Sequence, residues 1–228
     1  MPTRTIRDVA ALLDHAVLKP NFTAADLAAH AAMCVARGVG CLCVRPADVA
    51  AAVGHVAGSP VVVASVIGFP HGSHRPETKA LESRLAIADG AKELDMVIAL
   101  GPLLSGDESR VRDDIAAVVA AARPYGVLVK VIFETCYLTP AQIVTACRLA
   151  EEAGANFVKT STGFGTAGAT PETVRLMLDT VGGRLGVKAS GGIRTWDDAV
   201  MYLDMGCTRL GVGDAAAILD GSTAAGAY

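Results

Sequence analysis

Two lysines lie in segments that are otherwise apolar or small. Lys159 lies in the segment 157–163, FVKTSTG, and Lys188 lies in the segment 186–192, GVKASGG. Both segments are typical of short buried strands that run into small polar residues and glycines. A charged lysine in such a strand is costly unless it is paired or used. Because one ammonium group favours loss of the proton from a neighbouring one, the pair predicts a free amine that can form a Schiff base with a carbonyl compound.

Strand alternation predicts which charged residues join these lysines. Side chains two residues apart on a strand share a face, and on this basis one polar cluster can form at the centre of the fold. Its expected members are Asp14, Asp95, Lys130, Lys159 and Lys188. Two carboxylates and three lysines leave one excess positive charge, which favours loss of a proton from one lysine. The titrations of such closely spaced groups are coupled.

Short apolar runs alternate with longer alanine-rich amphipathic stretches along the whole chain. Threonine or threonine-proline precedes several of the helical patterns, and glycine follows many of them, as expected for helix caps. The predicted strands are 15–18, 41–44, 61–67, 93–98, 127–134, 157–160, 186–189 and 209–212. The predicted helices are 24–36, 77–89, 110–122, 140–153, 171–180 and 195–204.

Eight strands that alternate with helices favour a parallel sheet. In a chain of 228 residues they fit a single (β/α)8 TIM barrel, near the short end of its size range. A doubly wound open sheet is the alternative, although no GxGxxG follows the first strand. No linker divides the chain, so we expect one domain over residues 1–228, with residues 221–228 as a flexible C-terminal tail.

Composition excludes several classes of function. The formal charge of −3 gives no broad attraction to nucleic acid or to an anionic membrane. The six cysteines form no CxxC pair, and no signal segment is visible at the N-terminus, so we expect reduced thiols in a cytoplasmic protein. No apolar stretch reaches the length of a membrane span. His71 and His74 lie in a Pro-Gly loop that cannot form an HExxH helix, so we predict no metal site.

Four segments together resemble the deoxyribose-phosphate aldolase family. They run in order along nearly the whole chain: DHAVLKP at 14–20, ELDMV at 93–97, FVKTSTGF at 157–164 and VKASGGIR at 187–194. The combination of KTSTG with K-x-SGG-I-R is highly specific. The resemblance implies a TIM-barrel class I aldolase that converts 2-deoxy-D-ribose 5-phosphate to acetaldehyde and D-glyceraldehyde 3-phosphate, reversibly and without a metal or organic cofactor.

The resemblance also implies residue roles. Lys159 would form the Schiff base, Lys188 would keep it deprotonated, and Asp95 would be the acid/base group, acting through a bound water. Retro-aldol cleavage needs an electron sink, which a protonated imine supplies, and a base for the hydroxyl proton. Asp14 and Lys130 would tune this group. Residues implied in binding the substrate and its phosphate are Thr160, Gly163, Ser190, Gly191, Gly192, Gly211 and Gly213.

The predicted phosphate site departs from the family pattern after the eighth strand. The family carries serine there, whereas this chain has Gly213 followed by Asp214. Asp214 can be the N-cap of a helix at 215–219, or its carboxylate can repel the phosphate. Either role weakens a phosphate site, because a capping carboxylate uses the same N–H groups. An aldolase with a relaxed phosphate requirement, acting on unphosphorylated aldehydes or deoxysugars, is therefore the alternative function.

Two further residues correspond to family positions near the site. Cys43 can be a thiol that unsaturated aldehydes alkylate, or a buried cysteine that acts as a small apolar residue. Tyr228 can enter the site and assist proton transfer, or it can be a disordered terminal residue. A barrel that only binds a phosphosugar or a partner protein is a third reading. Family members are commonly dimers or tetramers, so we expect a homodimer or homotetramer that binds small-molecule substrates.

Overall fold

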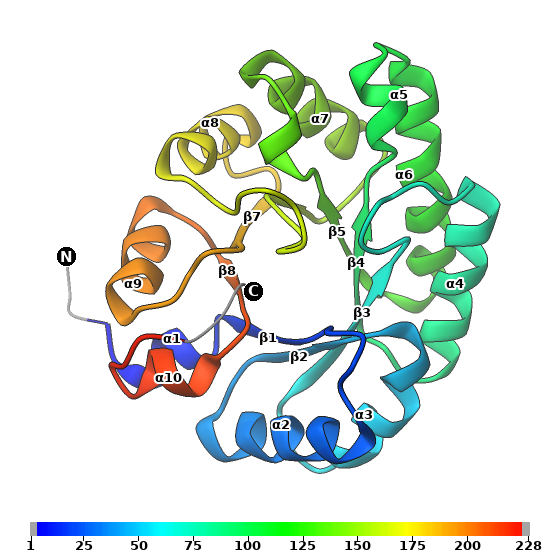
Figure 1. Ribbon diagram of the computed structural model, residues 1–228. Helices are drawn as coiled ribbons and strands as arrows, with labels where there is room; N and C mark the ends of the chain where they lie inside the picture. Colours follow the sequence, from blue (N-terminus) through cyan, green and yellow to red (C-terminus); the bar gives the residue numbers. More distant parts are fainter. Residues whose placement is uncertain (1–3, 225–228) are drawn as a thin grey trace.

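The computed structural model describes residues 4–224 and forms a closed barrel of eight parallel strands inside a ring of helices (Figure 1). Each strand pairs with the next in chain order, and β8 pairs with β1 through Leu13 opposite Leu210 and Asp14 opposite Gly211. Closure confirms the predicted (β/α)8 barrel and excludes the open sheet. The strands are β1 (Leu13–Val17), β2 (Cys41–Val44), β3 (Val62–Ile67), β4 (Glu93–Val97), β5 (Leu128–Ile132), β6 (Phe157–Lys159), β7 (Gly186–Ser190) and β8 (Arg209–Val212).

The helices include all those that the sequence predicts and several short ones that it does not. Helices α1, α3 and α5 are additional, because five to seven residues are too few to show a helical period. The helices are α1 (Ile6–Ala10), α2 (Ala24–Arg37), α3 (Val49–His55), α4 (Pro76–Ala88), α5 (Leu100–Leu104), α6 (Glu108–Ala122), α7 (Pro140–Glu152), α8 (Pro171–Val181), α9 (Trp196–Met205) and α10 (Ala215–Leu219).

Threonine caps fix where the main helices begin. Thr23, Thr139 and Thr195 each accept a hydrogen bond from the N3 backbone N–H, and the N3 side chain accepts one from the threonine backbone N–H. These capping boxes satisfy donors that the first turn of a helix leaves open. Gly38 and Gly206 close α2 and α9 in the left-handed conformation, which a side chain disfavours. The helices therefore end at the loops that carry the chain back to the barrel.

The strands separate two different interiors. Their outward face packs Val, Leu, Ile and Met against the helices and makes the main hydrophobic core. Inside the barrel, β1 to β3 present a small apolar group, whereas β4 to β8 present charged side chains, to which β1 adds Asp14. The apolar group consists of Ala16, Leu18, Cys41, Cys43, Ala64 and Val66, with Phe69 packed against it. The barrel is therefore half apolar and half charged, and the charged half is the candidate site.

Helix lengths also bear on membranes. Within residues 4–224, no helix combines the length and the apolar character needed to cross a bilayer.

Candidate active site

Seven charged side chains from β1 and β4 to β8 meet inside the barrel. Six of them are at most 5% exposed as side chains, and the Arg209 side chain is 13% exposed. Burial of so many charges is tolerable only because each one is paired. The cluster consists of Asp14, Glu93, Asp95, Lys130, Lys159, Lys188 and Arg209.

Asp95 joins the three lysines. Its Oδ1 accepts a hydrogen bond from Lys130 Nζ at 2.8 Å. Its Oδ2 accepts from Lys159 Nζ at 2.8 Å and from Lys188 Nζ at 2.7 Å. Lys159 and Lys188 therefore share one carboxylate oxygen, and their nitrogens lie within interaction range. The predicted set of Asp95, Lys130, Lys159 and Lys188 does point inward to one place.

Asp14 and Glu93 complete the cluster with Arg209. Asp14 binds Lys188 through a short contact, Lys130 at 3.1 Å and Arg209 Nη1 at 2.8 Å. Glu93 binds Lys130 Nζ at 2.5 Å and Arg209 through a short contact. The sequence analysis did not count Glu93 or Arg209. Because they add one charge of each sign, three carboxylates now face four cations and the predicted single excess positive charge is unchanged.

The pairing of neighbouring strands could have identified Arg209 as a member of the cluster. Lys188 is paired in register with Arg209, so the two side chains lie on the same face of neighbouring strands. Gly211 is two residues further along β8. A Cβ there would lie 2.3 Å from Ser190 Oγ and 3.2 Å from Lys188 Cε. Gly211 therefore leaves room for the Lys188 side chain, a local reason for glycine besides the predicted phosphate contact.

The electrostatics of the cluster follow from its pairing. Burial alone would raise the pKa of Asp95, but Lys130, Lys159 and Lys188 outweigh it and hold the pKa well below the usual range. Burial alone would lower the pKa of Lys188, but Asp14 and Asp95 raise it above the usual value. In the resting protein Lys188 is therefore an ammonium and Asp95 a carboxylate.

The segment after β6 forms one wall of the barrel mouth. Thr160 Oγ1 donates to Ser190 O at 2.9 Å and accepts from Ser190 N at 3.0 Å. The Thr160 side chain thus ties β6 to β7 rather than facing the cluster. Gly163 has a φ of 87°, in the left-handed region that favours glycine. It lies where the chain turns toward Phe164 over the barrel opening.

The loop after β7 also adopts a conformation that needs glycine. Gly191 and Gly192 have φ values of 83° and 79°. A Cβ on the nearby Gly168 would lie 2.2 Å from the carbonyl oxygen of Gly191, so the two loops touch through their backbones. Such a close backbone turn can present N–H groups to an anion. The predicted phosphate residues after β7 therefore stand at the mouth beside the segment that follows β6.

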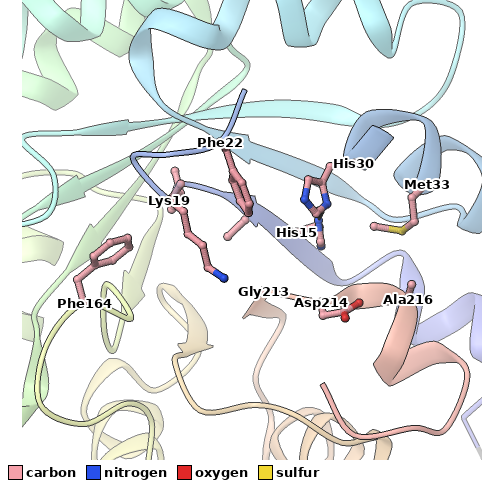
Figure 2. A pocket seen from close by; sticks show the side chains of 11 residues that line it. His15, Lys19, Phe22, His30, Met33, Phe164, Gly213, Asp214 and Ala216 are labelled. Atoms are coloured by element: carbon pink, nitrogen blue, oxygen red, sulfur yellow. Dashed lines mark hydrogen bonds between the residues drawn. The ribbon is translucent and has the colours of Figure 1, made fainter. Parts of the chain in front are cut away.

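Asp214 is the N-cap of α10, as one of the two readings predicts. Its Oδ1 accepts a hydrogen bond from Ala217 N at 3.0 Å. Gly213 and Asp214 also line a cavity of about 400 Å³ that opens above β1 and β8. Figure 2 shows the Lys19 amine and the Asp214 carboxylate entering this cavity from opposite sides. Lys19 is a basic group that the sequence analysis did not assign.

Two histidines, His15 and His30, line the same cavity. His15 Nε2 and His30 Nδ1 are 2.9 Å apart (Figure 2). His15 Nδ1 also accepts a hydrogen bond from Ala215 N at 3.3 Å. Burial and the neighbouring His30 lower the pKa of His15 to about 4. The pair is therefore neutral at neutral pH and links β1 to α2 and α10.

Cys43 lies inside the barrel and is 1% exposed. Burial raises its pKa to about 11, so the thiol stays protonated and behaves as a small apolar residue. Tyr228 lies outside the described residues. Among residues 4–224, the one group with metal-ligand spacing is Asp14, Cys41 and Glu93. Its two carboxylates already bind Lys130 and Arg209, which leaves a cation no free charge to pair with.

Comparison with known proteins agrees with this geometry. Residues 9–210 match the DeoC/LacD family aldolase model. The deoxyribose-phosphate aldolase of Mycolicibacterium paratuberculosis is 52% identical over 225 residues, which cover 96% of this chain and 98% of the relative. That of Thermococcus gammatolerans is 48% identical and covers 94% and 96%. A tetrameric deoxyribose phosphate aldolase structure from Aeropyrum pernix is 33% identical with a TM-score of 0.88, covering 95% of this chain and 91% of its own.

A barrel with paired lysines at its centre is an arrangement of enzymes that act on carbonyl compounds. The chain belongs to the DeoC/LacD aldolase family.

Proposed function

We propose that this chain is a class I aldolase that cleaves 2-deoxy-D-ribose 5-phosphate to acetaldehyde and D-glyceraldehyde 3-phosphate. The observation that carries the proposal is the single oxygen of Asp95 shared by Lys159 and Lys188 inside the barrel. Among residues 4–224 Lys159 pairs only with Asp95, whereas Lys130 and Lys188 each pair with two or more carboxylates, so Lys159 is the lysine to which we assign the attack. Relatives of about half identical sequence, each named deoxyribose-phosphate aldolase, support this substrate.

The reaction follows from these groups. Lys159 Nζ adds to the aldehyde carbon, C1, and water leaves, giving a protonated imine. The C2–C3 bond then breaks, and its electron pair moves into the imine to form an enamine. The proton of the C3 hydroxyl passes to Asp95 through a water molecule, and glyceraldehyde 3-phosphate leaves. The same proton returns to C2, and hydrolysis of the imine releases acetaldehyde and restores Lys159.

Turnover and trapping together test the proposal. The protein is mixed with 2-deoxyribose 5-phosphate, and glyceraldehyde 3-phosphate is followed with a coupled dehydrogenase. Borohydride is then added with acetaldehyde, and the modified peptide is identified by mass spectrometry. We expect turnover and an adduct on Lys159. Absence of both, in protein that unfolds cooperatively, would overturn the proposal.

The Asp214 carboxylate favours a second possibility, a weak preference for phosphorylated substrates. Replacing Asp214 with asparagine keeps an oxygen that can cap α10 and removes the charge. If the carboxylate repels the phosphate, kcat/KM for 2-deoxyribose 5-phosphate should rise about tenfold or more, since two unit charges at about 4 Å interact by several kcal/mol. The value for 2-deoxyribose serves as the internal control and should not change. Equal values for variant and wild type on both sugars would show that Asp214 only caps the helix.

We also propose that the chain assembles into a homodimer or homotetramer. The Aeropyrum pernix relative is tetrameric, and α4 carries two exposed leucines one turn apart, Leu81 at 50% and Leu85 at 58% exposure. An apolar ridge of this kind is typical of a surface between subunits. Light scattering coupled to size-exclusion chromatography measures the mass. A monomeric mass at micromolar concentration would contradict this proposal.

A further inference from the structure

Glu134 follows β5 in a conformation that a side chain disfavours. Its φ is 54° and its ψ is 62°, and it is the one non-glycine residue with positive φ among residues 4–224. A left-handed residue with a Cβ costs about 1–2 kcal/mol. The sequence analysis placed Glu134 at the end of the fifth strand. That prediction was wrong, because β5 ends at Ile132 and a left-handed residue cannot continue a strand.

The carboxylate of Glu134 is buried and bound to the segment that follows Lys159. The residue is 4% exposed. Its Oε1 accepts from Thr162 N at 3.2 Å, and its Oε2 accepts a short hydrogen bond from Thr162 Oγ1. Thr162 Oγ1 in turn accepts from Phe164 N at 3.0 Å. One carboxylate therefore fixes the backbone from Thr162 to Phe164, beginning three residues after the proposed Schiff-base lysine.

Phe164 is the side chain that this arrangement places over the mouth. It contacts Phe69 edge to face, with ring centroids 5.3 Å apart. It also lines three separate cavities, of about 400, 120 and 340 Å³. Glu134 lines the 120 Å³ cavity together with Thr162. The ring therefore lies between these cavities, and Figure 2 shows it at the edge of the 400 Å³ cavity that Lys19 also lines.

Stability alone does not account for Glu134. Burial raises its pKa, and the Thr162 hydrogen bonds and the positive charge of Lys159 offset this only in part. A strained backbone and a buried carboxylate both oppose folding, and strained residues of this kind cluster where function requires a fixed geometry. Gly165 adds to the constraint, because a Cβ there would lie 2.9 Å from Glu134 Cδ and 3.0 Å from Cys136 Sγ.

We propose that Glu134 is a positioning residue that holds Thr162 and Phe164 in the arrangement that encloses a carbonyl substrate bound at Lys159. The proposal rests on the proposed function, since it assumes that chemistry occurs at Lys159. Glu134 acts through the Thr162–Phe164 segment and does not itself contact the reacting atoms.

Steady-state kinetics and thermal unfolding of four variants test this role. Glu134→Gln removes the carboxylate that accepts from Thr162 Oγ1, and Thr162→Val removes that donor, so each should lower kcat about tenfold or more, with a smaller change in KM. Thr162→Val also removes the acceptor for Phe164 N, so the double variant should lose no more than Thr162→Val alone. Glu134→Gly also relieves the left-handed conformation. It should therefore lose kcat while its melting temperature stays at or above that of Glu134→Gln. Glu152→Gln, an exposed carboxylate on α7, is the matched control and should match the wild type.

The outcomes are distinguishable from failure of the proposed function. Turnover by the wild type establishes that function independently, and the ratio of variant to wild type then tests Glu134. If the wild type does not cleave 2-deoxyribose 5-phosphate, the rate of borohydride trapping with acetaldehyde replaces kcat in the comparison. Unchanged rates in Glu134→Gln and Thr162→Val, or losses that simply add in the double variant, would overturn the positioning role.

Discussion

Replacing Lys159 with methionine is expected to reduce the retro-aldol rate by about 10⁴-fold or more and to abolish borohydride trapping. Methionine has nearly the length of lysine but no amine, so no imine can form and the C2–C3 bond loses its electron sink. The fold should persist. Three carboxylates in the cluster would then face three cations, Lys130, Lys188 and Arg209, and no buried charge is left unpaired. The melting temperature should therefore stay close to that of the wild type, or rise.

The matched control is the same substitution at Lys92, an exposed lysine immediately before β4. Lys92→Met should keep full activity and the same trapped adduct. Coupled turnover, intact-mass measurement after borohydride, and thermal unfolding are recorded on both variants. Trapping that persists in Lys159→Met would assign the Schiff base to another lysine and contradict the proposed mechanism.

Much of the barrel follows from the sequence because its strands are short and uniform. The starts predicted for β2, β4, β6, β7 and β8 agree with the structure. The inward face was also predictable. Side chains two residues apart on a strand share a face. Lys159, Lys188 and Asp95 each lie within a short apolar strand, so the same alternation predicts that all three point into the barrel.

The parts that the sequence did not predict depend on contacts between distant strands. Arg209 was expected only as the first residue of the eighth strand, yet its guanidinium binds both Asp14 and Glu93 inside the barrel. Glu134 was expected in a strand, because glutamate gives no local signal for a left-handed conformation. Its geometry is set by Thr162, which lies 28 residues away in sequence. The local sequence pattern therefore predicts the strands and helices, whereas contacts between residues distant in sequence determine which further side chains join the site.

Replacing Lys188 with methionine is the sharper test of how the site works. Lys188 is the ammonium that brings the cluster to one excess positive charge. Burial alone would lower the pKa of Lys188, but Asp14 and Asp95 outweigh burial and raise it. Without it, three carboxylates face Lys130, Lys159 and Arg209 alone. Three cations then balance three carboxylates, and the cluster no longer has the excess positive charge that favours loss of a proton from a lysine.

The expected result of Lys188→Met is a loss of about 10²–10³-fold at neutral pH, since it removes a like charge bound to the same Asp95 oxygen, and such charges interact by several kcal/mol at an effective dielectric of about 20. The expected change of activity with pH follows from the same charge balance. An imine forms only from an amine that has lost its proton, so activity should recover as the pH is raised, with the rising limb of the pH profile displaced to higher pH. Rates of turnover and of borohydride trapping, measured from pH 6 to pH 10, report this displacement. A loss of equal size at every pH would instead make Lys188 a group that contacts the substrate directly, and the charge-balance account of the lysine pair would then fail.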